Sequence, residues 1–397
     1  MTIFRSERIA AFILLAAAAL GLVAANSALG PAVIRFQATH LTVPGTPFDL
    51  SVGHWVSDGL LALFFFVVAI ELKHELTVGH LNSPARAIRP AIAALGGIVV
   101  PIAIYLAFAG GSGYSHGWPI PTATDIAFAL GVLAVFGRGI PGRLRVFLLA
   151  LAILDDIVAI VIIAVFFTRD PNLGALAVAT LGVAAFAVLS RFLGTRARIP
   201  VAIGMVAAAL VAWGFVYLSG VHATIAGVAL GLAMASRPGM RVRHALEPLT
   251  NGFVLPLFAF SAALVVLPRV GLGGLSAPFW GILVALPVGK LAGIAAGGWL
   301  SGFVGPRESR SQLTFLNLAT VGALGGIGFT VSLLMNELAF AEAPEVAAEG
   351  TIAVLLGSVF AIVLSAILVS TQASYYRRLR ALRASVIRDR DAPGSSR

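Results

Sequence analysis

The sequence predicts an all-α polytopic membrane protein with about twelve transmembrane helices. Of its 397 residues, 59% are hydrophobic and only 11% are charged, whereas soluble globular proteins carry about 25% charged residues. Apolar stretches of about 18 residues or more recur along the chain, and each is long enough to cross a bilayer core of roughly 30 Å. The alternating apolar and polar pattern of a membrane β-barrel is absent from the sequence.

The predicted spans follow one another along the whole chain. The first could be read as a signal peptide after Arg5 and Arg8, but its apolar run is too long and more spans follow, so we expect an uncleaved helix. Only the short stretch SGVH at 219–222 separates the seventh and eighth spans. The twelve spans cover 9–29, 58–77, 88–109, 117–137, 143–168, 174–193, 199–219, 221–236, 249–268, 280–303, 315–336 and 351–373.

The basic residues predict the orientation of these spans. If the N-terminus is cytoplasmic, nearly all of the 27 Lys and Arg residues fall on the cytoplasmic side, and the outside loops hold only Arg35, Arg169 and Arg269. This asymmetry follows the positive-inside rule and places both termini in the cytoplasm. It also explains the net charge of +10, so we expect contacts with anionic lipids and no nucleic-acid binding. Cysteine is absent, which excludes disulfides, zinc–thiolate sites and cysteine nucleophiles.

We expect one transporter domain over 1–376 and a basic cytoplasmic tail over 377–397, which begins as a helix extension and ends disordered. The longest outside loop is 30–57. Its segment 41–56 alternates and contains the turn sequence PGTP, which is typical of a small hairpin. An irregular loop is the equal alternative there.

Four charged residues fall near the middle of predicted spans: Asp125, Asp155, Asp156 and Lys290. Each costs roughly 2.5–3.5 kcal/mol to insert, and such residues usually face a bundle interior and mark ion or proton routes. A structural ion pair, such as Asp155 with Lys290, would account for one carboxylate. The other two would still need protons or a bound cation, so the set indicates ion transport.

The adjacent pair Asp155 and Asp156 lies in LALAILDDIV at 149–158. Neighbouring helical residues point about 100° apart, so one carboxylate can face an ion while the other meets a partner on another helix. Carboxylates this close titrate as a coupled pair. Either can hold a proton or bind a hard cation through its oxygens.

Two spans contain helix-breaking residues. PIPTATDIAFALG at 119–131 includes Thr124 beside Asp125, and GALGGIGFTVSLL at 322–334 includes Gly326 and Gly328. A simple proline kink is the alternative for the first stretch. Paired interruptions in corresponding halves of a chain point to the binding site of a secondary transporter.

At these residues the chain resembles the NhaA sodium/proton antiporters of bacterial inner membranes, over roughly 50–370. The resemblance is carried by FFFVVAIELKHEL (64–76), ATDIAFALGVLAVFG (123–137), FLLALAILDDIVAIVIIAVFFT (147–168), SGVHATIAGV (219–228), LPLFAF (255–260), PVGKLAGI (287–294) and GGIGFTVS (325–332). It implies an inner-membrane homodimer, with the hairpin suited to dimerisation, that exchanges cytoplasmic Na+ or Li+ for more external protons per cycle and needs no cofactor.

The resemblance also implies a fold and residue roles. The segments 88–168 and 280–373 would form inverted repeats, a feature of this family, with the two broken helices crossing at mid-membrane. Asp156 would be the main Na+ ligand beside Asp155, which would pair with Lys290. Thr124 and Asp125 would lie at the crossing together with Gly326 and Gly328, and Asp125 would offset the positive helix ends there.

The chain departs from the family in its expected pH-sensing funnel. The family usually has an arginine at His74, and a glutamate and a lysine where this chain has Arg243 and Met240. Glu71, His74 and Glu75 share one helix face by their spacing, and a solvated charge cluster is the alternative reading. For His222 we favour a structural hydrogen bond over a role in carrying protons.

Three other function classes compete with antiport. An intramembrane aspartyl protease would need its two aspartates on different helices and a GxGD motif, whereas this chain has adjacent aspartates and GIGF. A cation channel would not couple ion flow to protons. The strongest alternative is a related secondary transporter or cation symporter for another solute. We therefore expect a transporter without enzymatic activity.

Overall fold

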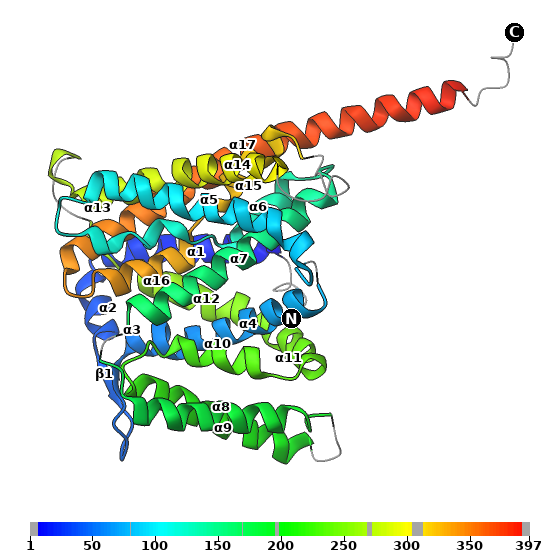
Figure 1. Cartoon of the computed structure of the whole chain (residues 1–397). Helices are drawn as coiled ribbons and strands as arrows, with labels where there is room; N and C mark the ends of the chain where they lie inside the picture. Colours follow the sequence, from blue (N-terminus) through cyan, green and yellow to red (C-terminus); the bar gives the residue numbers. More distant parts are fainter. Residues whose placement is uncertain are drawn as a thin grey trace, which may run out of the picture.

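The computed structural model describes residues 7–79, 81–168, 170–194, 198–267, 272–303 and 313–390. In this part of the chain, eight helices are long and apolar enough to cross a membrane, and up to ten if each of two bent pairs forms one span. The protein is therefore an all-α polytopic membrane protein (Figure 1). The predicted spans at 221–236 and 249–268 contain only shorter helices, so the count of twelve stays a prediction.

The first half of the chain holds the hairpin and the first broken span. Its elements are α1 (Glu7–Ala25), α2 (Gly30–Gln37), β1 (His40–Thr42), β2 (Asp49–Ser51), α3 (Val52–His54), the π-helical turn η2 (Trp55–Leu60), α4 (Leu61–Thr77), α5 (Pro84–Ala109), the 3-10 turns η3 (Ser115–Gly117) and η4 (Ile120–Thr122), α6 (Ile126–Phe136), α7 (Gly142–Phe166) and α8 (Leu173–Ser190).

The second half holds the other broken span and the longest helix. Its elements are α9 (Arg198–Leu218), α10 (Thr224–Ala233), α11 (Ser236–Leu249), the π-helical turn η5 (Thr250–Val254), α12 (Leu255–Ala262), the 3-10 turn η6 (Leu272–Gly274), α13 (Ala277–Val284), the π-helical turn η7 (Ala285–Gly289), α14 (Lys290–Leu300), the 3-10 turn η8 (Ser301–Phe303), α15 (Phe315–Gly325), α16 (Phe329–Ala339) and α17 (Pro344–Arg390).

The outside loop contains more structure than the sequence analysis assigns to it. Helix α2 is bent away from α1 by 113°. It is a separate helix with Pro31 in its first turn, a position that suits proline. Strands β1 and β2 pair antiparallel, with Leu41 opposite Leu50. The hairpin is thus confirmed over the irregular loop, but it ends at Ser51, since residues 52–56 already begin the next span.

Two further boundaries need correction. The segment between the predicted spans at 221–236 and 249–268 is not a plain loop, because it forms the basic helix α11 before η5 and α12. The last predicted span at 351–373 is shorter than the candidate span Pro344–Leu379 within helix α17. Helix α17 continues past residue 377, as expected for a tail that begins as a helix extension. The predicted disordered end, 391–397, lies outside the described residues.

The helices run roughly parallel in layers. Figure 1 shows α8 and α9 at one edge, α4 and α10 beside them, and α5, α14 and α17 toward the opposite edge. Helices α5 and α14 pack closely, because Gly96 and Gly293 face each other and a side chain on either would collide with the backbone of the other helix. This close approach positions Lys290, which begins α14.

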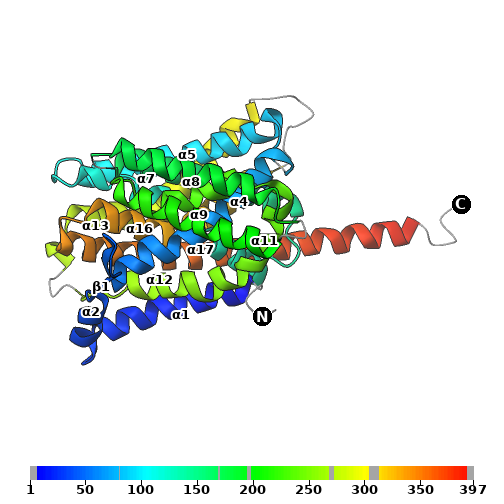
Figure 2. The same ribbon diagram turned by 90° about the horizontal axis from the view of Figure 1, so that it is seen from below.

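Both ends of the described chain lie at the same end of the bundle. In Figures 1 and 2 the first turn of α1 and the projecting part of α17 lie toward one end, and the β-hairpin lies at the opposite end. This arrangement agrees with the predicted placement of both termini on one side of the membrane.

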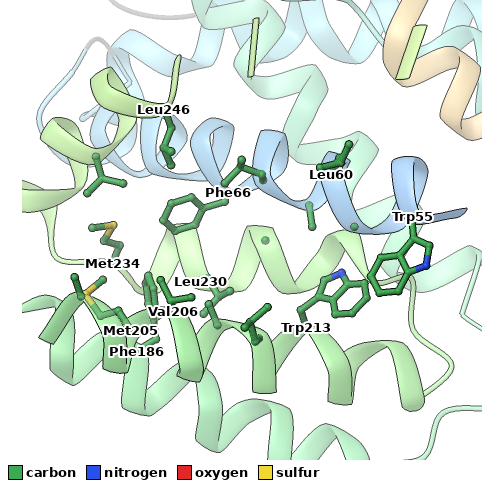
Figure 3. Close-up of a pocket in the computed structure, with 18 of the residues that line it drawn as sticks. Trp55, Leu60, Phe66, Phe186, Met205, Val206, Trp213, Leu230, Met234 and Leu246 are labelled. Carbon is green, nitrogen blue, oxygen red and sulfur yellow. The ribbon is translucent and has the colours of Figure 1, made fainter. Parts of the chain in front are cut away.

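An apolar groove of about 830 Å³ runs between α4 and α9, over α10 (Figure 3). The rings of Trp55 and Trp213 stack against each other at a centroid distance of 5.7 Å. Their indole N–H groups donate to the carbonyl oxygens of Leu41 and Asp58, so the polar edge of each ring is satisfied and the groove is lined by apolar surface.

Candidate ion-binding site

The two broken spans touch at their interruptions. The backbone is extended from Ala123 to Asp125, before α6, and α15 and α16 are bent by 51° at the break between them. The amide of Asp125 donates to the carbonyl oxygen of Ile327 over 2.6 Å. Each break leaves backbone groups without helical partners. Here a backbone amide at the first break is bonded to a backbone carbonyl at the second.

Asp125 caps two helices at once. Its Oδ1 accepts the amide of Phe128 in α6 over 3.2 Å. Its Oδ2 accepts both the amide and the hydroxyl of Thr330 in α16, at 3.2 Å and 2.7 Å. A helix N-terminus carries a partial positive charge, so the two helix starts stabilise one buried carboxylate.

A second cluster lies beside the first and joins four spans. Lys290 Nζ donates to Asp155 Oδ2 over 2.6 Å and to Thr124 Oγ1 over 3.2 Å. Thr124 Oγ1 lies 2.7 Å from Asp155 Oδ2 and 2.8 Å from the carbonyl oxygen of Gly325 at the end of α15. The hydroxyl has one proton, so it donates to one of these two acceptors at a time. The ion pair expected between Asp155 and Lys290 is present.

The adjacent carboxylates of α7 have different surroundings. Asp155 faces Lys290, and its Oδ1 is buried without a hydrogen-bond partner among the described residues. Asp156 instead lines a cavity of about 330 Å³, together with Thr124 and Asp125. Within the described residues, no hydrogen bond or ion pair to the Asp156 carboxylate is found. Asp156 is thus a cavity-lining carboxylate that has no polar partner among the described residues.

The cavity also reaches part of the predicted pH-sensing funnel. Glu71 of α4 and Arg243 of α11 line it and form an ion pair of 2.8 Å. His74 and Glu75 do not line this cavity. They share one face of α4 with Glu71 by their spacing, but they lie about one turn nearer the C-terminal end of the helix.

The two predicted glycines allow close packing at the break. A side chain on Gly326 would approach the carbonyl oxygen of Leu286 to 2.9 Å, and one on Gly328 would approach Leu286 Cδ2 to 2.7 Å. Leu286 belongs to η7, one residue before Pro287 and shortly before Lys290. The glycines therefore let the turn η7, which leads into α14, pack directly against the break.

Comparison with known proteins agrees with this arrangement. A family model described as Na+/H+ antiporter 1 matches residues 1–369. The chain belongs to this antiporter family.

Its relatives resemble it over nearly their whole length. The Na+/H+ antiporter NhaA 2 of Clavibacter michiganensis subsp. michiganensis is 58% identical over 382 residues, covering 95% of this chain and 93% of the relative. The Na+/H+ antiporter NhaA of Tropheryma whipplei is 48% identical, covering 93% and 94%. That of Streptomyces avermitilis is 43% identical, covering 98% and 84%.

The sequence analysis missed three hydroxyl residues of this antiporter chain. Thr330 donates to Asp125, Ser332 Oγ donates to the carbonyl oxygen of Ile120 over 2.7 Å, and Ser358 of α17 accepts the amide of Phe329. Each is a small polar residue inside an apolar span, which is a weak signal because such residues often bond only to their own helix. Their partners depend on tertiary packing.

His222 lies away from the antiporter's central cavity. Its Nε2 is 3.1 Å from Asp58 Oδ1 in η2, and its Nδ1 is 2.8 Å from Thr224 Oγ1. Both ring nitrogens thus have partners that connect the start of α10 to η2. This geometry favours the structural role that the sequence analysis preferred.

Proposed function

We propose that this chain is a secondary transporter that exchanges cytoplasmic Na+ or Li+ for external protons at Asp155 and Asp156. The observation that carries the proposal is the uneven neutralisation of three buried carboxylates. Two helix N-termini face Asp125, and Lys290 pairs with Asp155, whereas Asp156 faces the cavity without a polar partner among the described residues. A carboxylate buried in this way requires a proton or a bound cation to neutralise its charge.

The relatives' names supply the transported ions. Proteins up to 58% identical to this chain are named Na+/H+ antiporters, which supports Na+ and H+ as substrates. The available donors suit a small hard cation, because carboxylate oxygens of Asp156 and the unpartnered Oδ1 of Asp155 are oxygen ligands. We include Li+ for the same chemical reason.

Exchange follows from competition for the same oxygens. The deprotonated pair binds a cation from the cytoplasmic cavity, and protons arriving from the outside displace it. The empty site carries uncompensated negative charge, which is costly in low dielectric. The site therefore switches its exposure from one side of the membrane to the other when it holds either a cation or protons. We propose that more protons than cations move per cycle, so that exchange is electrogenic.

The moving parts in this proposal are two inverted repeats, 88–168 and 280–373, within a fold of twelve helices. Each segment contains one interrupted span, and the interruptions contact each other through Asp125 and Ile327. Alternating access would then be a rocking of the repeats around this contact.

The proposal also includes regulation by pH and a location in the membrane. We place a pH-responsive funnel at Glu71, His74, Glu75 and Arg243, with the Glu71–Arg243 ion pair as its part nearest the cavity. The domain over 1–376 lies in a bacterial inner membrane as a homodimer with cytoplasmic termini. The basic tail from 377 onward suits contact with anionic lipids.

Proton flux in proteoliposomes, followed with an acridine dye, tests the proposal. The wild-type chain should show proton movement on addition of Na+ or Li+, and Asp156→Asn should abolish it. Asp170→Asn is the matched control, because Asp170 is exposed and has a φ of 43° that asparagine also tolerates.

Three results would contradict the proposal. Sodium-driven proton flux retained in Asp156→Asn would reject Asp156 as the ion ligand. A response to K+ or Ca2+ but not to Na+ would favour a related transporter for another solute. Sodium movement without proton coupling would favour a channel.

A further inference from the structure

The long helix α17 contacts the break between α15 and α16 through one serine. Ser358 Oγ accepts the amide of Phe329 over 3.2 Å, and both residues are buried, at 0% and 1% exposure. Phe329 is the first residue of α16, so its amide has no carbonyl partner one turn earlier within that helix. Ser358 therefore supplies a cap from a different helix.

The next amide of α16 is capped from another direction. Thr330 N donates to Asp125 Oδ2. Two successive amides at the start of α16 thus bond to two separate elements, α17 and the first broken span. Each of these two bonds therefore helps to fix the position of the first turn of α16.

The residue before the serine contacts the turn that leads to Lys290. A side chain on Gly357 would lie 3.4 Å from Leu286 Cβ and Cδ1, so Gly357 and Leu286 pack closely. Leu286 is fully buried in η7. One turn of α17 therefore contacts both the start of α16, which faces Asp125, and the turn before Lys290, which faces Asp155.

We infer that Ser358 is a positioning residue for the central charge network: its hydroxyl holds the start of α16 where Thr330 reaches Asp125. The effect on transport rests on the proposed function. Without the hydroxyl, the Phe329 amide gains a partner only if the break tightens toward a carbonyl of residues 325–327. That movement would draw Thr330 away from Asp125, whose anion would lose a stabilising donor.

Asp125 shares its surroundings with several other charged groups, which determine the pH response together. Those on the elements around the cavity and the adjacent cluster are Glu71 of α4, Arg145, Asp155 and Asp156 of α7, Arg243 and Glu247 of α11, and Lys290 of α14. A weaker helix cap at Asp125 changes the field at all of them. The pH profile is therefore a sensitive measure of the position of α16.

The test compares Ser358→Ala with Ser365→Ala. Ser365 is also fully buried on α17, but its hydroxyl donates only to Ile362 in its own helix among the bonds of the described residues. Hydrogen exchange of the segment 326–334 is measured for the full-length protein in detergent, and the pH dependence of sodium-driven proton flux is measured in proteoliposomes. Ser358→Thr keeps the hydroxyl and serves as the conservative variant.

We expect Ser358→Ala to accelerate exchange in 326–334 by roughly tenfold, as for the loss of a buried hydrogen bond. We also expect a shift in the pH profile of its sodium-driven proton flux, with Ser358→Thr closer to wild type. Ser365→Ala should change neither quantity.

Two outcomes would overturn the inference: exchange equal in Ser358→Ala and Ser365→Ala, or faster exchange in Ser358→Ala with an unchanged pH profile. The exchange measurement does not depend on transport. A wild-type chain without sodium-driven flux would thus reject the proposed function, and the exchange result would still decide the cap.

Discussion

Lys290 and Asp155 form an ion pair of 2.6 Å in which neither side chain has any exposed surface. The pair joins α14 to α7 at the point where the two broken spans meet. One consequence is that the Asp155 carboxylate is paired with the Lys290 ammonium group, while the neighbouring Asp156 carboxylate faces the cavity.

Lys290→Ala should destabilise the protein strongly. It leaves the Asp155 carboxylate buried without its cation, and breaking a buried pair from one side costs about 3–5 kcal/mol. The melting temperature in detergent measures this effect. The double variant Asp155→Asn/Lys290→Met removes both charges and should recover much of the loss. Equal melting of the single and double variants would contradict the prediction, as would a change of cation selectivity with unchanged melting and pH response.

Thr330→Val should weaken the bridge between the two broken spans. Valine keeps the shape of threonine but removes the hydroxyl that donates to Asp125 Oδ2 over 2.7 Å. We expect a loss of about 1–3 kcal/mol in stability and a changed pH profile of exchange. Thr180→Val is the control, because the hydroxyl of the exposed Thr180 bonds, among the described residues, only to the carbonyl oxygen of Leu176 in its own helix. The prediction is wrong if both valine variants melt alike.

Glu71 and Arg243 should show a modest energetic coupling. Their side chains are 31% and 17% exposed, so solvent screens the pair and we expect about 0.5–1 kcal/mol in a double-mutant cycle. The cycle uses Glu71→Gln, Arg243→Gln and the double variant, with melting measured at low and high salt. A coupling near zero at low salt would show that the 2.8 Å contact contributes nothing to stability.

The hairpin should lose order in acid through Asp49. The Thr42 hydroxyl donates to Asp49 Oδ1 over 2.7 Å, and His40 lies 3.3 Å from Oδ2. The hydrogen bond from Thr42 and then the charge of His40 hold the pKa of Asp49 below its ordinary value. A lowered pKa means that the contribution is present above the unfolded-state pKa and is lost as pH falls through the folded-state pKa.

Hydrogen exchange of residues 40–51 checks this sign. Asp49→Asn should exchange faster than wild type near neutral pH, and the difference should disappear in acid, where the wild-type carboxyl is also neutral. A difference that grows as the pH falls would contradict the assignment. Asp170→Asn, outside the hairpin, should show no such dependence.

Much of the fold could be predicted because membrane spans are encoded locally. The separation of α9 from α10 at SGVH is correct, since a short polar stretch interrupts two apolar runs. The helices α2 and α11 were not predicted, because neither is apolar enough to register as a span. The last span was predicted to be shorter than the helix that contains it, but the tail does begin as a helix extension, because α17 continues past residue 377.

The central cluster could be predicted in part. Charged residues in apolar spans are conspicuous, so Asp125, Asp155, Asp156 and Lys290 were found by composition alone. The bonds of Thr330 and Ser358 were not, because buried hydroxyls are common and most bond within their own helix. Helical spacing alone does not indicate that Glu71 lines the cavity while His74 does not.

The sequence by itself determined that this chain crosses a membrane many times and carries more buried carboxylates than its one buried lysine can neutralise. Both are properties of composition and of position along the chain, and both follow from the cost of placing charge in hydrocarbon. The pairing of Asp155 with Lys290 was expected from the family resemblance, but only the tertiary structure provides the geometry that pairs Asp155 and leaves Asp156 facing the cavity. Adjacent residues on α7 differ only in direction, and that difference has meaning once α14, α6 and α16 are packed around them.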